Sequence, residues 1–129
     1  MFKSYYTEEQ LYTIMYQAEH SGAYVSHIRG KICLSLDDFF REVSSSMRFP
    51  YYFGWNWAAF DECITDLDWL TFSNILIVID SFDSVFHEEN NQQLLQNTLI
   101  RYLRGAVEYW KSQNITVTVY LNYERTRDD

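Results

Sequence analysis

The chain has 129 residues, the size of one domain, and 47% of them are hydrophobic, which excludes a disordered protein. Its net charge of −8 argues against nucleic acid as a direct partner, because phosphate binding needs clustered lysine and arginine. No apolar run reaches the ~18 residues of a membrane span, and Glu8 and Glu9 stand where a signal peptide would be apolar, so we expect no membrane association and a cytoplasmic location.

The first half of the chain predicts two helices and one strand. A helix is expected over residues 7–20, since Thr7 is a favoured N-cap residue and two glutamates follow it. Residues 23–28 are expected to form a short strand, with a turn at Gly30. Ser35 and Asp38 have the spacing of a capping box, which indicates the start of a second helix.

The middle of the chain predicts an aromatic loop followed by a third helix. Residues 51–55 read as the loop, and Gly54 is the residue expected to adopt a strained backbone conformation. Asn56 can cap a helix from Trp57 to about residue 67. The spacing of its apolar residues predicts one buried face, which leaves its acidic residues toward water.

The last third predicts a buried strand, the longest helix and a final strand. Residues 74–80 form an apolar run that is typical of a parallel strand buried on both faces. Residues 88–113 are expected to contain the longest helix, which Asn114 can end in a left-handed turn, and residues 115–121 alternate as a strand does. The tail from residue 122 to 129 is expected to fray. The order of elements predicts an α/β fold with a three-stranded parallel sheet covered by helices.

The net negative charge of the chain arises from one window. Between Phe49 and Ile100, 52 residues contain eight acids and no lysine or arginine, whereas the rest of the chain has ten acids and ten bases. The window opens on an aromatic run. Acids beside exposed aromatics suit a surface that binds a cationic partner. A solvated acidic face over core aromatics is an equally open interpretation.

The sequence lacks the motifs of common catalytic sites. The glycines form no phosphate-binding loop, and the histidines lack metal-ligand spacing, so we expect no cofactor and no metal. Asp61 and Glu62 are adjacent, and adjacent helical residues diverge around the axis, so they cannot flank one scissile bond by themselves. A hydrolase that uses them with Asp80 is therefore the least favoured hypothesis, and we expect a protein that is not an enzyme.

The aromatic run and the helix after it resemble the barstar family of ribonuclease inhibitors. The segment is Phe49-Pro50-Tyr51-Tyr52-Phe53-Gly54-Trp55-Asn56-Trp57, followed by Phe60-Asp61-Glu62-Cys63-Ile64-Thr65. The resemblance covers about residues 23–121 and implies three parallel strands with packed helices. It divides the chain into a helical extension, residues 1–22, and a barstar-like domain, residues 23–129, within one globular unit. The extension could brace the sheet edge or widen the interface.

The resemblance also implies a function, which is to bind a basic nuclease toxin domain and occlude its active site. A ribonuclease is the nuclease that the resemblance favours. Tyr52 matches the contact aromatic of the family, and Glu62 matches its dominant contact acid, which is Asp in barstar. Asp61 takes the place of a contact Trp. Ala58 and Tyr109 stand where barstar has contact acids, which points to a cognate toxin other than barnase.

The full set of predicted partner-binding residues is Tyr52, Trp55, Ala58, Asp61, Glu62, Thr65, Asp66 and Tyr109. The loss of two family acids also leaves open a second hypothesis. In that alternative the protein kept the fold but became a self-associating scaffold or a regulatory adaptor that does not inhibit a nuclease.

Overall fold

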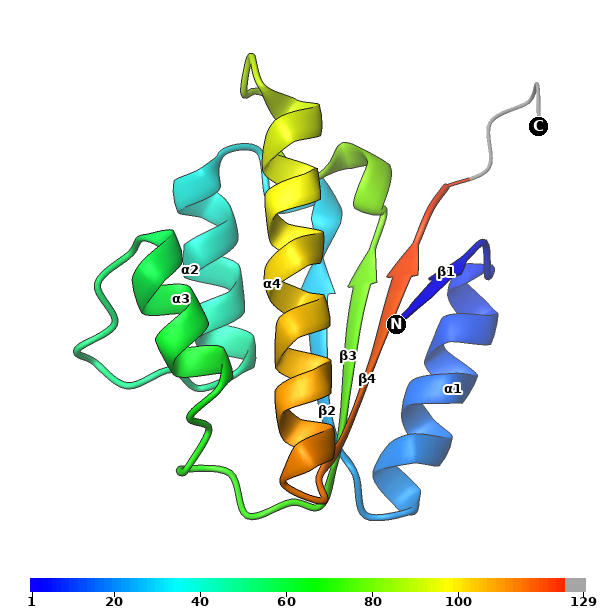
Figure 1. Ribbon diagram of the computed structural model, residues 1–129. Helices are drawn as coiled ribbons and strands as arrows, with labels where there is room; N and C mark the ends of the chain where they lie inside the picture. Colours follow the sequence, from blue (N-terminus) through cyan, green and yellow to red (C-terminus); the bar gives the residue numbers. More distant parts are fainter. Residues whose placement is uncertain (125–129) are drawn as a thin grey trace.

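The computed structural model describes residues 1–124 and shows a parallel sheet between two layers of helices (Figure 1). The elements in chain order are β1 (Phe2–Ser4), α1 (Glu8–His20), β2 (Tyr24–Arg29), a 3-10 turn (Gly30–Ile32), α2 (Leu36–Ser46), α3 (Trp57–Ile64), β3 (Asn74–Asp80), a second 3-10 turn (Phe82–Ser84), α4 (Gln92–Ser112) and β4 (Thr116–Asn122). The α/β class and the parallel pairing of β2, β3 and β4 agree with the sequence prediction.

The sheet has four strands, not the three that were predicted. Its order is β1-β4-β3-β2, and β1 pairs with β4 in parallel, with Phe2 opposite Tyr120. The side chain of Asn122 fixes this edge, because its Oδ1 accepts hydrogen bonds from Ser4 Oγ (2.9 Å) and Tyr6 N (2.7 Å). A three-residue strand is too short to show an alternating pattern, so only this long-range pairing reveals it.

Strand β3 forms the centre of the core, since its residues Ile75–Ile79 are all buried. Ile75, Ile77 and Ile79 belong to the large cluster under α2, α3 and α4. Leu76 and Val78 point to the other face, where they form a second cluster with α1. The N-terminal helix therefore packs on the second face of the sheet, over Leu76 and Val78, while β1 extends the edge of the sheet (Figure 1).

Local capping signals behave as predicted at three helix starts. Thr7, Ser35 and Asn56 each accept a hydrogen bond from a backbone N–H three residues on, at 3.1, 3.2 and 2.8 Å. The first two complete capping boxes, and that of Ser35 with Asp38 is the predicted one. Asn114 has the predicted left-handed conformation, with a φ of 61°.

Three details differ from the prediction. The left-handed residue of the aromatic loop is Trp55 (φ 56°), not Gly54. Helix α3 ends at Ile64, before the predicted end near residue 67, and Leu67 has a left-handed φ of 47° that is incompatible with the helix. Helix α4 lies within the predicted range of residues 88–113. Asn122 is buried in β4, so the predicted fraying does not begin there. Residues 125–129 of that predicted tail lie outside the described residues.

Gly30 is required where β2 meets the carboxyl end of β3. A Cβ atom at this position would overlap the backbone carbonyl oxygens of Asp80 and Ser81. Gly105, in α4, has open space around it. We expect Gly30→Ala to lower the free energy of unfolding by about 1–3 kcal/mol. Gly105→Ala is expected to raise it by about 0.5–1 kcal/mol, since glycine weakens a helix interior. Urea unfolding checks both, and equal effects of the two substitutions would contradict this packing.

Candidate partner-binding surface

Helix α3 is fixed against the body of the protein by its inner face. Phe60 and Ile64 are fully buried. The Trp57 ring stacks on Tyr102 of α4, with ring centroids 5.4 Å apart and planes 11° from parallel. Trp110 of α4 donates a buried hydrogen bond from Nε1 to the Ile64 carbonyl oxygen, at 2.8 Å. The outer face of α3 therefore stands on a rigid support, which lowers the entropy lost when a partner binds.

The loop before α3 is anchored at one aromatic residue and exposes three others. Phe53 is buried, with its ring centroid 5.6 Å from that of Phe40 and in contact with a second phenylalanine of the loop. Tyr51, Tyr52 and Trp55 have relative exposures of 102%, 62% and 44%. Large exposed aromatics beside a rigid anchor are typical of protein-binding surfaces.

The acids at the centre of α3 are exposed and have no counter-charge. Within residues 1–124, no ion pair involves Asp61 or Glu62, and both side chains face water. Thr65 donates a hydrogen bond from Oγ1 to the backbone carbonyl oxygen of Asp61 at 2.7 Å, and not to its carboxylate. Two adjacent, uncompensated carboxylates create a negative potential that attracts a cationic partner.

A second acidic group follows the end of α3. A hydrogen bond with the Asp68 carboxyl group is the main cause that raises the pKa of Asp66 above its ordinary value, and desolvation and the charge of Asp68 add to it. The pKa of Tyr52 is also raised, first by desolvation and then by the charge of Asp66, with Glu62 contributing less. The exposed tyrosine and these acids are therefore close enough to influence one another electrostatically.

The predicted contact residues fall into two groups by position. Residues 52–66 form one continuous stretch of loop and helix, in which Tyr52, Trp55, Ala58, Asp61 and Glu62 are exposed and Thr65 and Asp66 are half-buried. Tyr109 comes from α4; it is 43% exposed and packs on Trp110, the residue bonded to the end of α3.

Two exposed residues of this surface were missing from the prediction. They are Tyr51, the most exposed aromatic of the loop, and Asp68, the partner of Asp66. The sequence contained a signal for both. Tyr51 is next to the predicted contact Tyr52, and Asp68 is two positions from the predicted contact Asp66.

The described residues were also compared with the requirements of a metal site, a reactive thiol and a membrane-spanning helix. No group of three or more His, Cys, Asp or Glu within residues 1–124 is arranged to hold a metal ion. Cys33 and Cys63 are free and buried, and burial raises the pKa of Cys33 to about 12, so this thiol is neutral at physiological pH. None of the helices in that part of the chain has both the length and the apolar character needed to cross a bilayer.

The fold is that of an α/β protein with a parallel sheet. A comparison with protein families identifies the family to which the chain belongs. The family model described as Barstar (barnase inhibitor) matches residues 23–122. The chain therefore belongs to the barstar family, a family of inhibitors, as its aromatic loop and acidic helix indicated. A search of curated proteins found no match to the chain. Residues 1–22, with β1 and α1, lie outside the family match.

The raised pKa of Asp66 predicts a pH-dependent stability. Its ionised form is disfavoured in the folded protein, and this penalty exists above the folded-state pKa and disappears as the pH falls below the unfolded-state pKa. We expect Asp66→Asn to raise the Tm at neutral pH and to leave it unchanged at a pH below both values. Glu108→Gln, at an exposed acid of α4, is the control. A Tm of Asp66→Asn that falls at neutral pH would contradict this arrangement.

Proposed function

We propose that the protein is an immunity protein that binds and occludes the active site of a basic nuclease toxin, in the first place a ribonuclease, in the cytoplasm of the cell that makes it. The observation that carries this proposal is the pair of exposed carboxylates on α3, Asp61 and Glu62, beside exposed aromatics and within a window free of lysine and arginine. Membership of an inhibitor family supports it.

The physical basis is the match between an acidic helix and a nuclease cleft. Such a cleft is lined with Arg, Lys and His, which bind phosphate and stabilise charge in the transition state. Carboxylates on α3 would take the positions of phosphates, and Tyr52 and Trp55 would supply apolar contact around them. Close, desolvated charge pairs can contribute several kcal/mol each, and long-range attraction raises the rate of association.

The distribution of acids supports a partner other than barnase. Ala58, in the first turn of α3, is exposed and stands where the resemblance places a family acid. Against an unchanged partner this replacement would leave a cation unpaired, which is costly. Asp61 adds negative charge one turn further along α3, and Asp66 adds it just beyond the end of the helix. Ala58 would then permit close approach, and the partner's cations would lie nearer the carboxyl end of the helix.

The proposal predicts that binding depends on charge and on α3. The partner is a basic nuclease toxin domain from the same strain, inactivated by mutation. Asp61→Ala or Glu62→Ala is expected to raise the Kd by about tenfold or more, and high salt should weaken the wild-type complex. Glu19→Ala, at an exposed acid of α1 on the other side of the sheet, should leave the Kd unchanged. Calorimetry at two salt concentrations measures these effects.

Two other results would redirect the proposal. Tight binding that neither α3 substitution affects would keep the immunity role and move the contact surface away from α3. Absence of binding to any basic nuclease, together with a stable homo-oligomer in sedimentation, would favour the self-associating scaffold instead. The residues that support that alternative are Ala58 and Tyr109, at the two positions where the family acids are missing.

A further inference from the structure

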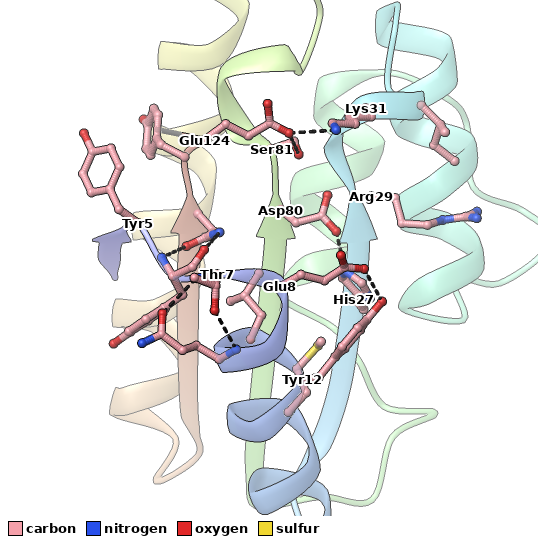
Figure 2. A pocket seen from close by; sticks show the side chains of 17 residues that line it. Tyr5, Thr7, Glu8, Tyr12, His27, Arg29, Lys31, Asp80, Ser81 and Glu124 are labelled. Atoms are coloured by element: carbon pink, nitrogen blue, oxygen red, sulfur yellow. Dashed lines mark hydrogen bonds and ion pairs between the residues drawn. The ribbon is translucent and has the colours of Figure 1, made fainter. Parts of the chain in front are cut away.

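The N-terminal extension and the carboxyl ends of the strands line an open cavity of about 890 Å³ (Figure 2). One wall comes from residues 5–12, outside the family match, and the opposite wall from His27, Asp80 and their neighbours at the ends of β2 and β3. The carboxyl edge of a parallel sheet is the usual place for a binding site in α/β proteins. This volume falls within the range of ligand-binding pockets.

The cavity is held open by hydrogen bonds across the sheet. Asn122 fixes the segment before α1 by accepting from Tyr6 N and donating from Nδ2 to the Tyr6 carbonyl oxygen, at 2.7 and 3.0 Å. Tyr123 N donates to the Ser4 carbonyl oxygen at 2.8 Å. On the far side, Asp80 accepts from Gly30 N at 3.0 Å and contacts His27 Nε2. Both walls are therefore fixed before any ligand arrives, which favours binding.

The basic residues at the rim are already neutralised. Arg29 donates from Nε and Nη2 to the Glu42 carboxylate, at 2.8 and 3.0 Å. Lys31 Nζ lies 3.0 Å from a carboxylate oxygen of Glu124. The first turn of α1 also carries two glutamates, which oppose a negative ligand at that helix end. The cavity is therefore unsuited to a phosphate or another anion.

Glu8 is the cavity carboxylate without a basic partner among residues 1–124. It accepts a hydrogen bond from the Tyr12 hydroxyl at 2.9 Å and joins no ion pair there. Figure 2 shows Glu8 and Tyr12 reaching toward the His27–Asp80 side of the cavity. The same two residues also line a second hollow of about 720 Å³ along α1, which continues to Tyr16. A carboxylate beside an exposed tyrosine ring suits a guanidinium group, which pairs with a carboxylate and stacks on aromatic faces.

We propose that this cavity binds an arginine side chain of a basic polypeptide segment, with the guanidinium paired to Glu8 and stacked on Tyr12, and with the segment running along α1 past Tyr16. The surface lies on the face of the sheet that α1 covers, opposite α2, α3 and α4. It is therefore separate from the proposed nuclease contact and stands or falls independently of it. The extension, on this proposal, adds a second protein-binding surface to the family domain.

The test is a titration of the isotope-labelled protein, residues 1–129, at low salt, followed through its backbone amide chemical shifts. The probe is an acetylated and amidated Gly-Arg-Gly-Arg-Gly peptide, and the control probe has citrulline in place of both arginines. We expect saturable shifts at Glu8, Tyr12 and His27, with binding of the citrulline peptide weaker by about tenfold, because citrulline has the shape of arginine without its charge.

Three variants assign the contact. Glu8→Gln keeps the size of the side chain and is expected to weaken binding about fivefold, and Tyr12→Leu should weaken it by removing the ring. Glu19→Gln, at the far end of the same helix, should bind as the wild type does. No saturable shift up to about 10 mM peptide, equal binding of the citrulline peptide, an unchanged Kd in Glu8→Gln, or shifts confined to α3 would each overturn the proposal.

Discussion

The structure depends on burying strand β3 on both faces. Five consecutive residues of β3, Ile75–Ile79, are buried, so each side of the sheet must be covered by helices. Helices α2, α3 and α4 cover the side of Ile75, Ile77 and Ile79, and α1 covers the side of Leu76 and Val78. Because the family match begins only at residue 23, the second cover is supplied by the extension. The same requirement therefore explains both the position of α3 and the presence of α1.

The packing that supports α3 also determines what its surface can do. Its inner residues join an aromatic core with Phe39, Phe40 and Tyr102, so the helix cannot turn its acids inward. Asp61 and Glu62 remain exposed and without a basic partner in residues 1–124, and Asp66 lies near a second carboxyl group. Charge repulsion of this kind lowers the stability of the free protein, and a cationic partner would relieve it. On the proposed function, this surface gives up stability for recognition.

Much of the fold could be predicted from local signals, whereas its long-range features could not. The capping of Thr7, Ser35 and Asn56 and the apolar run of β3 depend on neighbouring residues, so the sequence shows them directly. Strand β1 and the cavity beside it depend on Asn122, more than 110 residues away from Ser4 and Tyr6. The sequence predicted Gly54 as the strained residue of the loop because glycine is the usual choice at positive φ. The structure has Trp55 at positive φ instead, with its ring packed on that of Phe53. The predicted contact residues lie together, since most belong to one local stretch.

The measurement that tests the central claim most directly is hydrogen–deuterium exchange of the protein alone and in complex with an inactivated basic nuclease toxin domain. The account predicts slower amide exchange in the loop of residues 49–56 and in α3, with α1 unchanged, because the partner would cover the exposed aromatics and acids there. Protection confined to α1 and the ends of the strands, with α3 as accessible as in the free protein, would contradict the claim that α3 is the inhibitory surface.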